Sequence, residues 1–280
     1  MALRSPIFLD YETLLAHAEY HDVDVPRQAE VVEKVSRQRS LAGKAGLSGL
    51  GASGGVGSDV EYQSTYRLTP NLKATVSRVI DALIHEGGVK VGPDSETRLG
   101  RDDLVELTGR TRITTASLAG KLLHIVRRVL ADAELDVTQL DDLRADAPQM
   151  LAELKAVYLR NELPPIPILL EMTGTALPQR VYVSVRPDHF VDAAGANRLE
   201  GELRALGTVS HLVEGGDDGF LSAETWLLDG FEYLVKRKLM ASIGDQVKSL
   251  ATVLDLDLPA DDVHAYITGP AIIVDAIALY

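Results

Sequence analysis

A glycine-rich tract at residues 43–58 is the feature that most constrains this chain. The tract reads GKAGLSGLGASGGVGS, with seven glycines in sixteen positions. It contains a GxGxxG pattern, at Gly49, Gly51 and Gly54, and a GxSxG pattern centred on Ser53. The first pattern is typical of dinucleotide-binding loops and the second of hydrolase nucleophile elbows. The residues that flank the tract decide between these two sites and a flexible insertion.

Neither flank of the tract supports a cofactor site or a nucleophile. A dinucleotide loop leaves a buried strand and enters a helix, and a nucleophile elbow needs the same geometry. The preceding residues, VSRQRSLAGKAGLS, contain no buried apolar strand, and the following residues, VGSDVEYQ, do not begin a helix. A P-loop is excluded because the Gly43-Lys44 pair lacks the upstream glycine. We interpret the tract as a flexible or conditionally ordered insertion, since glycine at this density makes ordering costly.

The composition favours a globular protein that does not bind nucleic acid nonspecifically, although basic runs such as Lys236, Arg237 and Lys238 leave a local phosphate-binding role open. The 280 residues carry a net charge of −13 and a pI near 5.0, which repels phosphate backbones. The absence of cysteine excludes disulfides, thiolate nucleophiles and the usual zinc ribbons. Charges interrupt the N-terminal segment too often for a signal peptide, and no apolar run is long enough to span a bilayer. We expect a cytoplasmic location.

Hydrophobic periodicity predicts an α+β fold in which helices and strands are mixed along the chain. Helices are expected at residues 11–20, 26–40, 70–85, 115–131, 149–161 and 230–254. Strands are expected at residues 6–9, 60–68, 103–113, 166–172 and 180–185, with two β runs in 263–280. Residues 199–213 are expected to form one bent or two short strands, with a helix at residues 198–206 as the alternative. Gly244 is a candidate interruption of the last helix.

A proline-rich segment, LPPIP at residues 163–167, marks the expected domain boundary because proline cannot continue a helix interior. We predict an N-terminal α+β domain over residues 1–160, which carries the Gly-rich insertion, and a C-terminal α+β domain over residues 161–280. Segments 96–113 and 196–213 share an Arg-Leu start, an acidic turn and a glycine before the last apolar residues. This internal sequence similarity leaves open that the two halves are related by duplication.

Candidate catalytic and metal-binding side chains are scattered along the chain. His17 and His21 are four residues apart on a predicted helix, but the order HAEYH misplaces the glutamate that a zinc protease needs. A hydrolase site that gathers His189, Asp188 or His211 stays open as an alternative. We assign no catalytic, metal-binding or cofactor-binding residue from these patterns.

Aromatic side chains gather before and within the last predicted helix. They are Phe220, Trp226, Phe231 and Tyr233. Aromatic groups of this kind anchor hydrophobic cores or bind partners. We favour a core anchor and keep a partner-binding patch as the alternative.

Five segments together resemble a family of uncharacterised bacterial proteins, a domain of unknown function. They are the opening PIFLDYETLL, the glycine-rich tract, VYVSVRPDHFV at 181–191, RLEGELRALGTV at 198–209, and the closing GPAIIVDAIALY. The resemblance spans nearly the whole chain and brings no activity, ligand or catalytic residue with it. It implies a bacterial, cytoplasmic protein and an association with mobile or defence genes.

These observations predict a non-enzymatic interaction protein, a subunit or adaptor of a bacterial complex with a role in phage defence. We expect the tract to contact a protein partner or a second copy through Gly46, Leu47, Leu50 and Val56. Two alternatives remain open. One is a membrane-acting effector that places the tract on anionic lipid as a peripheral contact. The other is a hydrolase with an unrecognised histidine and carboxylate site. No cofactor is predicted.

Overall fold

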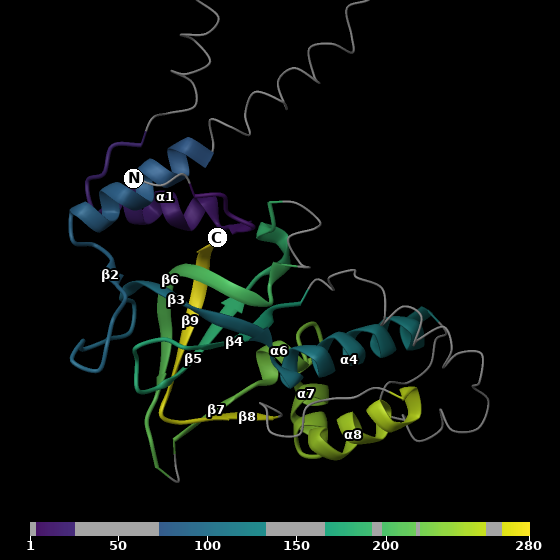
Figure 1. The fold of residues 1–280 in the computed structure, drawn as a ribbon. Coiled ribbons are helices and arrows are strands. Elements are labelled where there is room, and N and C mark those ends of the chain that lie inside the picture. The colour runs from purple at the N-terminus through teal and green to yellow at the C-terminus, as the bar shows by residue number, and fades with distance from the viewer. Residues whose placement is uncertain (1–3, 26–72, 133–165, 192–197, 217–218, 256–264) are drawn as a thin grey trace, which may run out of the picture. The chain divides into compact units, whose positions relative to one another are not determined.

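The computed structural model describes residues 4–25, 73–132, 166–191, 198–216, 219–255 and 265–280 (Figure 1). The chain divides into two compact units. The smaller unit combines residues 1–6 with residues 11–89, and the larger unit combines residues 7–10 with residues 90–280. Each unit has its own described elements and is considered separately.

Two helices form the described part of the smaller unit: α1 (Tyr11–Tyr20) and a helix over residues 73–85. Arg4 joins the N-terminal segment to the second helix, because its backbone N–H donates to Ser77 Oγ at 2.9 Å and its guanidinium pairs with Asp81. Both helices confirm the predicted helical periodicity. The side chains that they bury are Leu14, Ala18, Val76, Val79, Ile80 and Leu83.

Five strands of the larger unit close into a barrel (Figure 1). They are β3 (Leu104–Ile113), β4 (Ile168–Thr173), β5 (Arg180–Val185), β6 (Gly201–Val213) and β9 (Ala271–Leu279). The pairs β3–β4, β4–β5, β3–β6 and β6–β9 are antiparallel, and the pair β5–β9 is parallel. Two short strands extend the sheet: β1 (Phe8–Leu9) pairs with β9, and β2 (Lys90–Val91) pairs with β3. If the five barrel strands β3, β4, β5, β6 and β9 are renumbered 1 to 5 in chain order, the ring runs 1-2-3-5-4-1. Its third and fifth strands, β5 and β9, are the parallel pair. This is the strand order of an OB-fold barrel.

Period-two alternation sends the side chains of the barrel strands to two separate cores. Leu170 of β4 and Val274 of β9 belong to the inner cluster, which fills the barrel. Their chain neighbours Leu169 and Ile273 belong to an outer cluster, as does Tyr182 of β5. Strands that are buried on both faces are nearly continuous apolar runs, which explains the sequence AIIVDAIAL of β9.

Two glycines let the long strands bend close to their neighbours. A Cβ at Gly109 of β3 would lie 2.5 Å from the carbonyl oxygen of Thr173, and a Cβ at Gly207 of β6 would lie 2.4 Å from that of Asp275. The register of β6 against β9 also shifts at Gly207. Bulges and glycines at such bends supply the curvature that a small barrel requires. β6 is therefore one bent strand, as one of the arrangements expected from the sequence has it, and residues 201–206 are not helical.

A layer of helices covers the outward apolar side chains of β4, β5 and β9. The layer contains α4 (Thr115–Asp132), α6 (Glu224–Leu227), α7 (Tyr233–Met240) and α8 (Ile243–Leu254). Ser117 of α4 accepts the backbone N–H of Leu169 at 2.6 Å, which fastens α4 to β4. A Cβ at Gly120 would lie 2.0 Å from the carbonyl oxygen of Trp226, so this glycine permits the close contact of α4 with α6. OB-fold proteins bind ligands on the face of their second and third strands, here β4 and β5, and the layer occupies part of that face.

The prediction of a single helix at residues 230–254 is wrong, because the structure has two helices there. Ser242 lies between α7 and α8 with φ −129° and ψ 12°, outside the helical range. The break precedes Gly244, the residue that the sequence offered as an interruption. It allows Leu239 of α7 and Ile243 of α8 to reach the same outer core.

The fold is α+β, as expected, and several elements have the predicted bounds to within two residues. These elements are α1, α4, β3, β4 and β5. Other predictions lie outside the described residues: the helices at 26–40 and 149–161, the strand at 60–68, the glycine-rich tract, and the domain boundary at 160/161. Within the described chain, β3 from one side of that boundary pairs with β4 and β6 from the other side, and the compact units divide between residues 89 and 90.

Two glycine substitutions with opposite expected effects test the barrel geometry. Gly207→Ala places a Cβ against backbone and is expected to lower the free energy of unfolding by about 1–3 kcal/mol. Gly244→Ala lies in α8 with no atom within 4 Å of its Cβ, and we expect it to raise that free energy by about 0.5–1 kcal/mol. Urea unfolding followed by fluorescence of Trp226, the only tryptophan, measures both. Equal effects of the two variants would contradict the close approach at Gly207.

Candidate functional site

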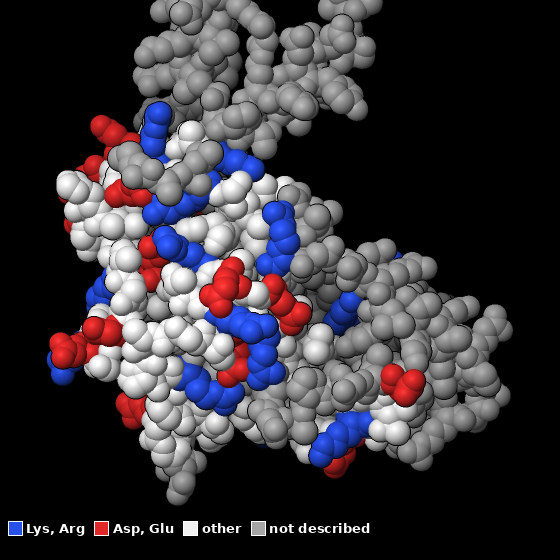
Figure 2. All heavy atoms as spheres, viewed as in Figure 1, with Lys and Arg blue, Asp and Glu red and all other residues white. Residues whose placement is uncertain are grey.

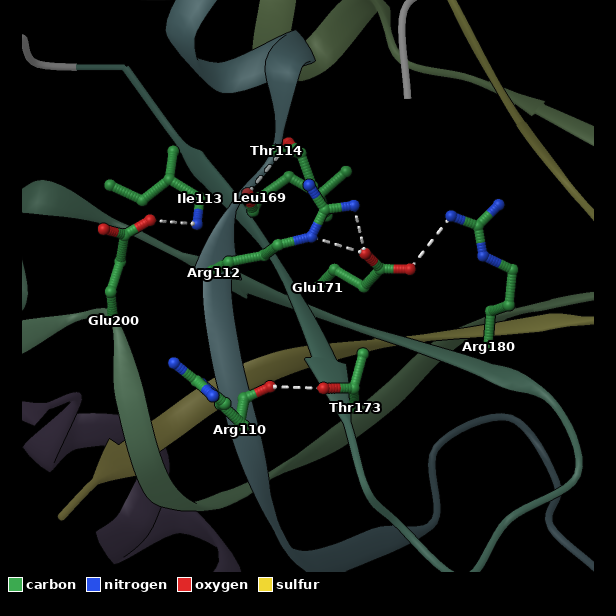
Figure 3. Close-up of polar contacts among 9 residues, drawn as sticks. All are labelled: Arg110, Arg112, Ile113, Thr114, Leu169, Glu171, Thr173, Arg180 and Glu200. Atoms are coloured by element: carbon green, nitrogen blue, oxygen red, sulfur yellow. Dashed lines mark hydrogen bonds and ion pairs between the residues drawn. The ribbon is translucent and has the colours of Figure 1, made fainter. Parts of the chain in front are cut away.

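The outer face of β3, β4 and β5 carries arginines around one glutamate (Figure 3). Arg112 and Glu171 are register partners in the β3–β4 pair. Arg112 Nε and Nη2 donate to one carboxylate oxygen of Glu171, at 2.9 and 2.6 Å. Arg180 Nη2 donates to the other oxygen at 2.9 Å. Glu171 therefore connects three neighbouring strands of the barrel through its side chain.

The carboxylate at the centre of this cluster is held in its charged form. The Glu171 side chain is 11% exposed, and burial alone raises the pKa of its carboxyl group. Hydrogen bonds from Arg180 and Arg112 outweigh burial and lower that pKa below its ordinary value. Because both oxygens accept bonds from guanidinium groups, the geometry suits positioning better than proton transfer.

The surroundings of the cluster mix both signs of charge. Arg112 and Arg180 are each 42% exposed, and the Arg180 guanidinium lies 5.2 Å from the ring centre of Tyr182. Glu200 accepts the backbone N–H of Ile113 at 3.1 Å beside them. On the face shown in Figure 2, the described Lys and Arg side chains are interspersed with Asp and Glu. The cluster is thus an ion-pair clamp rather than part of a basic stripe that would track a nucleic-acid backbone.

A second feature is a two-stranded ribbon at the edge of the larger unit. β7 (Phe220–Ser222) pairs antiparallel with β8 (Tyr266–Thr268). Phe220 is 60% exposed and Tyr266 is 48% exposed, and their rings meet edge to face with centroids 5.3 Å apart. They are diagonal neighbours across the ribbon, which is the spacing at which aromatic rings interact. The ribbon therefore displays an aromatic pair to the surface.

An open groove of about 440 Å³ lies beside the ribbon. It is lined by residues 211–216 and 219–221, which include the exposed side chains of Leu212 and Glu214. Gly219 and Gly269 pack closely against the backbone at Glu214, because Cβ atoms at these two glycines would lie 1.9 and 1.8 Å from the Glu214 carbonyl oxygen. Only glycine allows this backbone contact, so the groove has a defined wall next to the aromatic pair.

The four aromatic residues grouped in the sequence separate into two environments. Trp226 and Phe231 are buried in the outer core, which confirms the core anchor for these two. Phe220 and Tyr233 are exposed instead. Closeness in sequence did not reveal this division, because it depends on which face of the ribbon or helix each side chain occupies. The pairing of Phe220 with Tyr266 had no local signal, since the two residues are far apart along the chain.

The contact residues predicted in the glycine-rich tract, Gly46, Leu47, Leu50 and Val56, lie outside the described residues. The histidine pair lies at α1, where burial and then the charge of His21 lower the pKa of His17. In the described ranges, no group of three or more His, Asp or Glu side chains is placed to hold a metal ion. In the same ranges, no helix combines the length and the apolar character that crossing a bilayer requires.

The histidines of the hydrolase alternative lie apart. His189 Nε2 is 3.8 Å from a carboxylate oxygen of Asp188, and its ring contacts β1, which pairs with β9 at Leu279. His211 of β6 pairs with Ile273, near the other end of β9. At about 3.4 Å per residue, these two positions on β9 are roughly 20 Å apart. The described geometry does not bring His189 and His211 into one site.

Neutralising the clamp carboxylate gives a pH-dependent loss of stability. Glu171→Gln is expected to lower the free energy of unfolding at pH 7 by about 1–2 kcal/mol, discounted because both arginines are partly exposed. The native pKa is lowered, so the carboxylate stabilises the fold above its ordinary value of 4.5 and loses this contribution as the pH falls through the native pKa. Urea titrations at pH 7 and at acid pH measure the difference. Glu202→Gln, at an exposed position of β6, is the control, and a pH-independent difference would contradict the clamp.

Comparison with known proteins gives one family assignment. No curated protein and no solved structure matches the chain. A family model described as a domain of unknown function, DUF6414, matches residues 3–280. The match covers the smaller unit and the barrel together, in agreement with the resemblance noted in the sequence. The chain therefore belongs to the DUF6414 family.

Proposed function

We propose that this chain is a cytoplasmic, non-enzymatic interaction protein, a subunit or adaptor of a bacterial complex, and that it binds a protein through the β7–β8 ribbon. The observation that carries the proposal is the exposed aromatic pair of Phe220 and Tyr266. Exposed aromatic rings are enriched at the centres of protein interfaces, because they bury large areas at low entropic cost. The groove beside them offers a recess for a partner side chain.

A protein partner fits the larger unit better than a nucleic acid. Helices cover outward side chains of β4 and β5, and so occupy part of the face that OB-fold barrels use for oligonucleotides. The net charge of −13 opposes binding to phosphate backbones. The exposed rings of the ribbon are next to Glu214 rather than next to a basic groove, so they lack the electrostatic partner of a stacking platform.

A binding role is also favoured over catalysis by the described polar groups. Glu171 has both oxygens engaged by arginines, and His189 and His211 lie at different ends of β9. The role of the glycine-rich tract as a second contact, and the association with phage defence, stay predictions.

A photoreactive residue in the ribbon tests the proposal. We replace Phe220 with p-benzoylphenylalanine in the full chain, express it in the bacterium that encodes it, and irradiate the cells. One dominant adduct is expected, and mass spectrometry identifies the captured protein. The captured protein is then purified and titrated against the full chain. Phe220→Asp is expected to weaken the complex about thirtyfold, as loss of an interface hot spot does.

Val91 is the matched control position, since it is an exposed apolar residue on β2, which lies away from the ribbon in Figure 1. The same photoreactive residue at position 91 is expected to give no dominant adduct, and Val91→Asp is expected to leave the complex unchanged. Equal labelling at positions 220 and 91, or a purified complex that tolerates Phe220→Asp, would show the proposal to be wrong.

A further inference from the structure

We infer that the ribbon's partner is α7 of a second copy of this chain, so that two copies contact each other reciprocally. The inference rests on the proposed function and names its partner. Its starting point is a second exposed apolar surface in the larger unit. Tyr233 is 70% exposed and Leu234 is 77% exposed, and both begin α7.

The exposed residues of α7 share one face of the helix. At 100° per residue, Tyr233, Leu234, Arg237 and Lys238 fall within an arc of about 140°. All four are exposed, whereas Leu239 on the opposite side is buried in the outer core. α7 therefore presents two apolar side chains at its start and two cations one turn later.

The charges on α7 and on the ribbon are complementary. α7 contributes Arg237 and Lys238 to its exposed face. The ribbon is bordered by Glu214 in the groove and by Glu224, whose backbone N–H donates to Ser222 Oγ at 3.3 Å. The net charge of −13 repels anionic lipid and nucleic acid from most of the molecule, so a local basic face is better matched by an acidic protein surface. The ribbon of a second copy supplies apolar and acidic groups together.

The two surfaces adjoin within one copy. Lys236 Nζ of α7 lies 3.8 Å from a carboxylate oxygen of Glu224, and Glu224 is bonded to Ser222 at the end of β7. When two complementary surfaces lie side by side on one copy, a two-fold axis between two copies lets the ribbon of each copy contact α7 of the other. The dimer then has two equivalent contacts. Such a dimer buries the Phe220–Tyr266 pair and the Tyr233–Leu234 pair of both copies.

The test is a mixing experiment with the full chain. Analytical ultracentrifugation over a concentration series is expected to show a monomer–dimer equilibrium for the wild type. Phe220→Asp and Leu234→Asp are each expected to raise the dimer dissociation constant about thirtyfold. An equimolar mixture of the two variants is expected to form a heterodimer with one intact ribbon–α7 contact and one contact that is altered on both sides. Its dissociation constant is therefore expected to lie between that of the wild type and those of the single variants. Val91→Asp is the control and keeps the wild-type dissociation constant.

Circular dichroism of each variant checks that the fold is retained, and Phe220→Ala and Leu234→Ala replace any aspartate variant that does not fold. A dimer that tolerates changes at either surface overturns the inference, and so does a mixture whose dissociation constant is no lower than those of the single variants. A monomeric wild type overturns it too, and the photoreactive residue at position 220 then separates two cases. Capture of a different protein leaves the proposed function standing, whereas no dominant adduct overturns both.

Discussion

Closure of the five-stranded ring is the constraint on which the larger unit depends. Residues 205–208 of β6 pair with β3 on one edge and with β9 on the other, so this short stretch joins the two ends of the sheet. The inner core becomes enclosed only when that double pairing is made. Gly207 makes this double pairing possible, because β6 must bend where it passes the Asp275 backbone.

Closure also determines where the rest of the chain goes. β4, β5 and β9 carry apolar side chains on both faces, and the outer set needs a cover. The connection after β3 supplies α4, and the long connection between β6 and β9 supplies α6, α7 and α8. That second connection leaves the barrel through β7 and returns through β8, which makes the ribbon. The surface proposed for binding is therefore built by the same segment that covers the barrel, at the place where the segment departs from it.

Features that depend on interactions within one segment could be predicted from the sequence, whereas features that depend on contacts between distant segments could not. α1, α4, β3 and β5 have periodic side chains within a single segment, and local periodicity was sufficient to find them. Ring closure was not predictable in this way, because β3 pairs with β6 about a hundred residues later and no local pattern encodes that register. Glu171 was missed for the same reason, since its partners Arg112 and Arg180 come from two other strands. In the ribbon, an aromatic residue in a three-residue strand has the same sequence signature whether it points into the core or away from it.

The high net charge and the exposed aromatic pair have opposite effects on self-association. Two copies that each carry a charge of −13 repel at long range, which suppresses unspecific contacts between apolar surfaces. The cations of α7 and the carboxylates beside the ribbon attract only at close range and in one orientation. Salt screens the repulsion and the attraction alike, but the repulsion acts over distances longer than the Debye length and is screened first. Burial of the aromatic rings is insensitive to this screening, so the apolar contact supplies the affinity of the reciprocal dimer and the charges select its orientation.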